Sequence, residues 1–111
     1  QQLEIYLGMD PSVANTTGWR GTDQGSQLKE SGTSHWSSGN TGTNSSGFTA
    51  LPGGFCNTGG SFSLVGDFGG WWSATEDGSN AWIRYLYYND ATVGRFTDDK
   101  GYGYAVRCLR D

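Results

Sequence analysis

Residues 69–89 read GGWWSATEDGSNAWIRYLYYN and contain the two clearest strand patterns of the chain. Aromatic side chains are concentrated in two runs, 71–75 and 81–88, and a polar segment containing Gly78 separates the runs. Aromatic-rich runs bounded by short polar turns are typical of antiparallel strands. This stretch therefore predicts two strands of an antiparallel sheet.

Side chains alternate between the two faces of a strand, so 81–88 has two faces with different members. One face would hold Trp82, Arg84, Leu86 and Tyr88, and the other would hold Ile83, Tyr85 and Tyr87. Both faces are bulky. The pattern fits a central strand covered on both sides, and it equally fits a strand with one core face and one aromatic binding face.

Further elements flank this pair of strands. Two more strands are expected at 93–97 and 104–109, and Phe55 and Phe62 flank a turn at Gly59-Gly60. On the amino-terminal side, the apolar spacing within residues 1–9 predicts a helix that ends at Gly8.

A second short helix is expected at residues 25–31, with Leu28 pointing inward. The segment that follows, 32–47, is rich in Ser, Thr and Gly, and Trp36 is the side chain that would anchor it.

Composition limits the fold class. The chain has 111 residues with 19 Gly and 2 Pro, and 34% of its residues are hydrophobic while 14% are aromatic. Few aliphatic side chains are available, so rings must build much of the core. We therefore expect one small α+β domain whose core includes Trp72, Trp82 and Tyr104.

Charge limits the partners. Seven basic residues against eleven acidic ones give a net charge of −4 and no cluster of Lys or Arg. A nucleic-acid backbone is therefore an unsuitable partner. No apolar run approaches the roughly 20 residues of a membrane-spanning helix, so insertion of this domain into a membrane is not expected.

Five segments together resemble the Fibrobacter succinogenes major paralogous domain. They are GSQLKESGTSHW at 25–36, SSGFTALPGGF at 45–55, GGWWSATE at 69–76, NAWIRYLYYN at 80–89 and GYAVRCLRD at 103–111. The resemblance implies a C-type-lectin-like fold, similar to its formylglycine-generating-enzyme-like branch. It also implies a secreted or surface-anchored bacterial protein.

The resemblance places the start of this chain inside the family's first helix. We therefore expect one domain over residues 1–111 that lacks the family's amino-terminal strand, as a fragment of a longer chain. The usual partner of Cys108 would lie in that missing strand, and Cys56 stands where the family usually has another residue. A bridge between Cys56 and Cys108 stays open: it would close a loop of roughly 50 residues and stabilise by about 4 kcal/mol.

Catalytic chemistry has little support in the sequence. The single histidine, His35, lies in the Ser/Thr-rich loop without an obvious nucleophile or orienting acid. The cysteine spacing does not match the redox pair of formylglycine-generating enzymes, and the neighbouring acids at 76–77 and 98–99 read as solvated turns. The expected protein is not an enzyme.

No cofactor is expected, and calcium is the metal to consider. Oxygen ligands for it could come from Asn89, Asp90, Asp98 and Asp99. The chain lacks the EPN and WND triplets of calcium-dependent sugar-binding lectins and any D-x-D-x-D-G loop.

The expected ligand-binding residues lie in and after the strand 81–88. They are Tyr85, Tyr87, Asn89, Asp90, Arg95, Asp98 and Tyr102, with Trp71, Trp72 and Trp82 as further rings in the same part of the chain. Sugar rings stack on aromatic faces while amides, acids and guanidinium groups bond to their hydroxyls. Arg84 and Arg107, inside strand patterns, are expected to bind carbonyl or acidic partners within the protein.

Three function classes follow, in decreasing order of support. The first is non-catalytic recognition of carbohydrate at the bacterial cell surface or outside the cell. The second is a protein-binding adhesin or filament component, including a variant similar to the hypervariable ligand-binding proteins of diversity-generating retroelements. The third is an enzyme.

Overall fold

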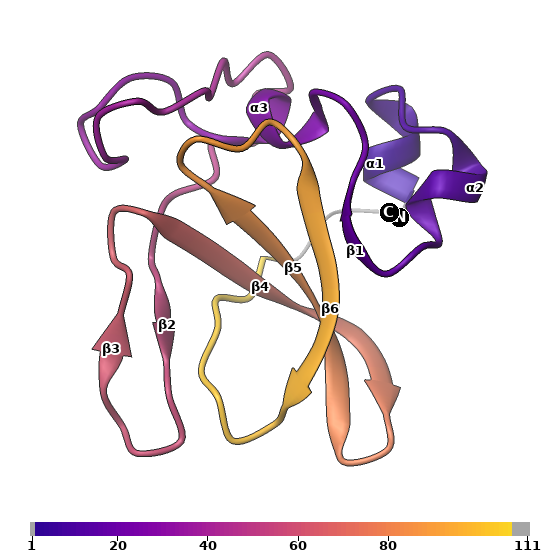
Figure 1. Ribbon diagram of the computed structural model, residues 1–111, viewed down its shortest axis with the longest axis vertical. Coiled ribbons are helices and arrows are strands. Elements are labelled where there is room, and N and C mark those ends of the chain that lie inside the picture. The colour runs from indigo at the N-terminus through magenta and orange to yellow at the C-terminus, as the bar shows by residue number, and fades with distance from the viewer. Residues whose placement is uncertain (1, 108–111) are drawn as a thin grey trace.

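The computed structural model describes residues 2–107, in which short helices precede a mostly antiparallel sheet. Figure 1 shows the helices gathered beside one end of this sheet. The elements in chain order are α1 (Gln2–Tyr6), α2 (Pro11–Ala14), β1 (Gly18–Arg20), α3 (Gln24–Leu28), β2 (Phe55–Cys56), β3 (Phe62–Ser63), β4 (Phe68–Asp77), β5 (Asn80–Tyr87) and β6 (Val93–Asp99). The expected α+β class is confirmed.

The main sheet has four strands in the order β1-β6-β5-β4, and every pair in it is antiparallel. The strands expected at 71–75, 81–88 and 93–97 are β4, β5 and β6. The turn at Gly59-Gly60 joins β2 to β3, a separate two-stranded hairpin. The register of β4 against β5 shifts between Trp72 and Glu76, where β4 bulges.

Two strand expectations need correction. The polar stretch around Trp19 contains β1, a three-residue edge strand beside β6 that carries too little pattern to be recognised from sequence. Residues 104–107 form no named strand. Gly103 pairs with Cys56 and Ala105 pairs with Trp71, because this segment crosses from the hairpin to β4 and pairs with one residue of each.

The two faces of the main sheet have different coverings, and the register assigns each side chain to one face. The helix face carries Arg20, Trp71, Trp82, Arg84, Leu86, Val93 and Arg95, and the aromatic face carries Trp19, Phe68, Trp72, Ile83, Tyr85, Phe96 and Asp98. Leu86 and Val93 pack with Leu28, Trp36 and Ala50 in the main core, so α3 and the long loop after it cover the helix face. β5 is a central strand with Ile83 and Leu86 buried on its two faces, and the half-buried rings on the Ile83 side keep the alternative of an aromatic binding face open.

The expectation that Trp72 and Trp82 centre the core is wrong. Both are half-buried, whereas Trp36 is 1% exposed and donates from Nε1 to the carbonyl of Ala50 at 3.0 Å. Trp82 precedes Leu86 by four residues, about 13 Å along the strand, so it lies beyond the reach of the helices. The expected role of Trp36 as anchor of the Ser/Thr-rich loop is confirmed.

Both expected amino-terminal helices are present. α1 is followed by Gly8, whose φ of +105° is a conformation that favours glycine. α3 covers 24–28 and directs Leu28 into the core, as expected, although it ends three residues earlier than predicted. Lys29 follows immediately and turns its buried ammonium group back into the protein.

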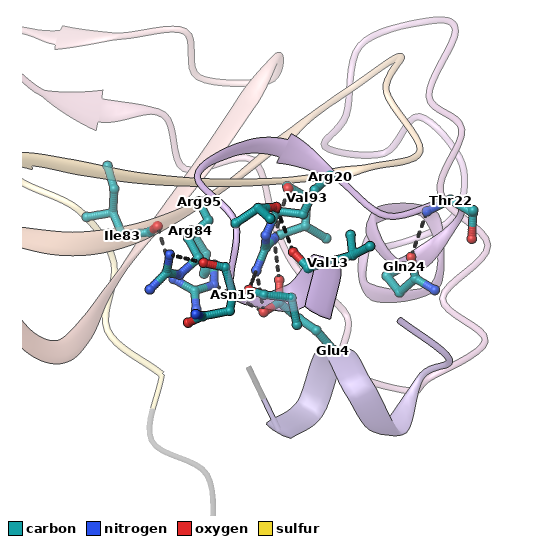
Figure 2. A network of polar contacts seen from close by, with 12 residues as sticks. Glu4, Val13, Asn15, Arg20, Thr22, Gln24, Ile83, Arg84, Val93 and Arg95 are labelled. Atoms are coloured by element: carbon teal, nitrogen blue, oxygen red, sulfur yellow. Dashed lines mark hydrogen bonds and ion pairs between the residues drawn. The ribbon is translucent and has the colours of Figure 1, made fainter. Parts of the chain in front are cut away.

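Three charged side chains, those of Glu4, Arg20 and Lys29, are buried inside the fold. Lys29 donates from Nζ to Thr41 Oγ1 and to the carbonyls of Tyr87, Tyr88 and Asp90, at 2.7 to 3.0 Å, and so ties α3 to the β5–β6 turn. Glu4 of α1 meets Arg20 of β1 and Arg84 of β5 (Figure 2). Among the described residues, no helix is long and apolar enough to cross a membrane.

Candidate functional site

A continuous layer of aromatic rings covers the face of the sheet that the helices leave open. We call it the aromatic layer; its members are Trp19, Phe55, Phe68, Trp72, Tyr85, Phe96, Tyr102 and Tyr104. The rings come from β1, β2, β4, β5, β6 and the segment after β6, with centroids 4.7 to 6.4 Å apart. Such spacings are those of interacting aromatic pairs.

Tyr85 lies at the centre of the layer and shares an acid with Tyr104. Its hydroxyl donates to Asp98 Oδ2 at 2.9 Å and lies 3.0 Å from the hydroxyl of Tyr104, which also donates to Asp98 Oδ2. Burial is the largest cause that raises the pKa of both phenols, and their bonds to Asp98 raise it further. Both phenols therefore stay protonated and hold the carboxylate in place.

Glycines on the neighbouring strands make room for this arrangement. Gly70 and Gly94 are the cross-strand partners of Tyr85. A Cβ at Gly70 would approach Tyr104 Cδ1 to 2.5 Å, and one at Gly94 would approach Phe96 Cε2 to 2.9 Å. The rings of Tyr104 and Phe96 can lie against the sheet only because both positions lack a side chain.

The layer ends in a tryptophan at each edge of the sheet. Trp19 on β1 is 42% exposed, and Trp72 on β4 is half-buried with its ring edge-to-face with Tyr104 at 5.0 Å. β1 and β4 are three strand spacings apart, about 14 Å. An elongated ligand could therefore contact both tryptophans while crossing Tyr85.

A hollow adjoins the aromatic layer between the β2–β3 hairpin and residues 103–105. Its volume is about 390 Å³, and Phe55, Cys56, Phe62 and Tyr104 are among its lining residues. Phe55 and Tyr104 belong to both features, so the hollow extends the layer away from the sheet.

The structure brings together three of the seven predicted ligand-binding residues. Tyr85, Asp98 and Tyr102 belong to or contact the aromatic layer, and Tyr85 projects opposite Trp82 and Leu86 as predicted. Tyr85 is half-buried, and its ring packs against those of Trp19, Phe68, Phe96 and Tyr104.

The other four predicted residues lie outside the aromatic layer. Tyr87 shares the face of β5 that carries Tyr85, as predicted, and is the cross-strand partner of Phe68, but it is half-buried with its ring against Tyr88 at 5.0 Å between centroids. Asn89 and Asp90 lie in the β5–β6 turn, where Asp90 Oδ1 accepts from the backbone N–H of Thr92 at 2.8 Å. Arg95 is on the opposite face of the sheet from Asp98, because the two residues are three positions apart along β6. The expected patch of rings, cation and acids is therefore divided between two faces.

The candidate calcium ligands are also divided. Asp90 and Asp98 lie at opposite ends of β6, and Asp98 is engaged by two tyrosines. Over residues 2–107, no three His, Cys, Asp or Glu side chains gather in a way that could hold a metal ion.

The remaining predicted side chains have simple partners. Arg84 contacts Glu4 at 3.3 Å and Arg107 donates to the carbonyl of Phe48 at 2.9 Å, which confirms the structural role expected for both arginines. His35 Nδ1 lies 3.0 Å from Glu30 Oε1. Cys108 is outside the described residues, so the Cys56–Cys108 pairing stays a prediction.

Comparisons with known proteins give one match. The family model described as the Fibrobacter succinogenes major domain matches residues 1–110. Neither the search of curated proteins nor the search of solved structures gives a match.

Proposed function

This chain belongs to the Fibrobacter succinogenes major domain family, and we propose that it is a non-catalytic recognition domain that binds carbohydrate outside the bacterial cell or at its surface. The aromatic layer carries the proposal. A stretch of rings with a polar group at its centre is a surface on which the apolar faces of sugar rings can stack. Asp98 Oδ2 accepts from two phenols and Oδ1 accepts from the backbone N–H of Asp99, so the carboxylate is held in place while it keeps lone pairs for a ligand hydroxyl.

The geometry favours a chain of sugars over a single sugar. Trp19 and Trp72 flank Tyr85 from opposite edges, so their rings offer two stacking positions with a central contact between them. A low content of charged residues, 16%, also suits a neutral polysaccharide.

We assign the fold, within the α+β class, to the C-type-lectin-like group. An antiparallel sheet, three early helices and the long loop between α3 and β2 support that assignment. Extracytoplasmic location belongs to the same proposal and draws on the resemblance of the sequence motifs to secreted and surface-anchored chains.

A glycan array followed by titration with the best neutral oligosaccharide tests the function. Trp19→Ala and Trp72→Ala should each weaken binding about five- to thirtyfold, since stacking on a ring is worth on the order of 1–2 kcal/mol. Tyr6→Ala is the matched control, because Tyr6 is an aromatic residue of α1 that is 86% exposed and outside the layer. Silence of the array, or equal loss in all three variants, contradicts the proposal.

Protein recognition is the second candidate, and one observation favours it. Phe62, Leu64 and Val65 are 75%, 45% and 68% exposed on and after β3, beside the hollow. An exposed apolar cluster of this kind suits a protein partner in an adhesin or filament.

The hypervariable version of that second candidate has a structural constraint. Tyr85 and Asp98 hold each other within the aromatic layer, so variation at these two positions would disturb the packing of the sheet face. Variable residues would have to lie at 62–65 or in exposed loops.

A further inference from the structure

A second hollow lies on the helix face of the sheet, beyond the part that the helices cover. Its volume is about 220 Å³, and its lining is formed by Ser73 and Thr75 of β4, Trp82 and Arg84 of β5, and Arg95 of β6. The bulge of β4 after Trp72 places the two hydroxyl residues beside the two arginines. We call it the arginine hollow.

Positive charge accumulates at the arginine hollow although the chain is acidic overall. Arg84 and Arg95 are direct cross-strand partners, and like charges in that position repel each other. The carboxylate of Glu4 contacts Arg20 and Arg84. Two arginines therefore share the carboxylate of Glu4, and within residues 2–107 the third, Arg95, forms no ion pair.

The guanidinium of Arg95 is fixed in position but incompletely bonded. It lies over the ring of Trp82, with 3.9 Å from Cζ to the ring centroid, and donates from Nη1 to the carbonyl of Asn15 at 3.0 Å (Figure 2). Its Nε is buried and has no acceptor among the described residues. An arginine carries five N–H donors, so Arg95 keeps capacity for an acceptor from outside.

Arg84 is similar. It uses Nε for Glu4 and Nη1 for the carbonyl of Ile83, at 3.3 and 3.4 Å, and both bonds are long. The pKa of Arg84 is lowered, and burial is the largest cause. The charges of Arg20 and Arg95 lower the pKa further, and only Glu4 raises it. A bound anion would relieve the repulsion that these neighbouring cations impose on one another.

We propose that the arginine hollow binds the carboxylate of an acidic sugar. Arg84 and Arg95 would bond to the carboxylate, since guanidinium groups match its planar geometry. Ser73 and Thr75 would bond to sugar hydroxyls, and the uncovered part of Trp82 would contact the sugar ring. The choice of a sugar over an acidic peptide rests on these hydroxyl groups and on the proposed function. The site itself is separate from the aromatic layer, on the opposite face of the sheet.

The test titrates the protein with a trimer of galacturonic acid and, in parallel, with a trimer of galactose, following tryptophan fluorescence and the heat of binding. Only the acidic trimer should bind through the arginine hollow, and its affinity should fall several-fold between about 50 mM and about 500 mM salt. Arg95→Gln should weaken binding at least about tenfold, because a hydrogen bond to a charged group is lost.

Arg107→Gln is the matched control. Arg107 also stacks on a ring, at 4.0 Å from Phe48, and also donates to one carbonyl, but it does not line the arginine hollow. Thr75→Val, at an exposed lining residue, gives a second variant that should weaken binding several-fold without a change in the fold.

Equal loss of binding to both trimers in Arg95→Gln, equal effects of Arg95→Gln and Arg107→Gln on the acidic trimer, or tighter binding of a glutamate-rich peptide would overturn the proposal. Failure here is distinguishable from failure of the proposed function. Trp19→Ala and Trp72→Ala act on neutral sugars at the aromatic layer and should leave binding of the acidic trimer unchanged.

Discussion

Arg20 and Glu4 form a two-contact ion pair inside the protein. Arg20 Nη2 lies 2.8 Å from Glu4 Oε1 and Nη1 lies 2.7 Å from Oε2, and the side chains are only 4% and 6% exposed. Arg20 also donates to the carbonyls of Val93 and Ala14, so this pair joins α1 and the end of α2 to β1 and β6. It attaches the helices to the sheet.

Glu4→Gln should destabilise the protein by about 3–5 kcal/mol. The substitution leaves buried Arg20 without its counter-charge, and breaking a buried pair on one side has a cost of that order. Urea denaturation at neutral pH measures the change. A loss below about 1 kcal/mol would show that water enters freely around Arg20.

Acid pH supplies the control for this prediction. Burial alone would raise the pKa of Glu4, but the Arg20 hydrogen bond and the charges of Arg84 and Arg20 outweigh burial and leave the pKa below its ordinary value of 4.5. The folded state therefore binds its proton less readily than the unfolded state. The stabilisation that ionised Glu4 contributes is therefore complete above pH 4.5. It is lost as the pH falls through the pKa of Glu4 in the folded protein, which lies below 4.5. The difference in free energy of unfolding between the wild-type protein and Glu4→Gln should therefore decrease as the pH falls through that range.

Trp36→Ala should destabilise by about 3–5 kcal/mol, and Trp82→Ala by less than about half of that. Trp36 is fully buried and holds the carbonyl of Ala50, whereas Trp82 is half-buried with Arg95 stacked on it. Thermal melts of the two variants make the comparison. The same loss in both would place Trp82 in the core after all.

High pH should destabilise the protein because unfolding allows the buried phenols of Tyr85 and Tyr104 to ionise. Tyr85 and Tyr104 have raised pKa values because burial and Asp98 disfavour their ionised forms. In the unfolded chain they ionise near pH 10, so stability is complete below about pH 10 and falls as the pH rises further. These two phenols should ionise only as the protein unfolds, so part of the phenolate absorbance should appear together with the loss of circular dichroism. Tyr85→Phe should reduce that part.

The sequence predicted the strands better than it predicted what lies on them. Runs such as 81–88 carry their own pattern, and β4, β5 and β6 follow from it. The face of the sheet that the helices cover depends on long-range packing. Trp36 could therefore be recognised as the anchor of a polar loop, but the sequence did not indicate that it would be more deeply buried than Trp82. Glycines in or beside the predicted strands were the signal for the aromatic layer: Gly94 lies inside the strand predicted at 93–97 and Gly70 directly precedes the one predicted at 71–75, and both allow close approach by aromatic rings.

Arg95 shows why the predicted site was only partly right. Arg95, Asp98 and Tyr85 were predicted to belong to one ligand-binding site, and β6 does pair with β5. Positions 95 and 98 have opposite parity, however, so only Asp98 can share a face with Tyr85. The alternation of side chains along β6 could be read from the sequence. The hydrogen bond from Tyr104 to Asp98 could not, because it depends on the path of residues 103–105 across the sheet.

Gly70→Ala should damage the aromatic layer specifically. The new Cβ would lie 2.5 Å from Tyr104 Cδ1, 2.9 Å from its Cε1 and 3.2 Å from Phe68 Cε1, so the Tyr104 ring must move away from the sheet. Overpacking of this kind has a typical cost of 1–3 kcal/mol. Gly53→Ala is the matched control, because a Cβ there has nothing within 4 Å and the backbone is not in the left-handed region. Movement of Tyr104 would also separate its hydroxyl from Tyr85 and Asp98, so the Gly70→Ala protein should ionise one tyrosine at a lower pH than wild type while still folded. If both glycine variants melt together and titrate like wild type, Tyr104 is not held against β4 and the aromatic layer does not have the packing described.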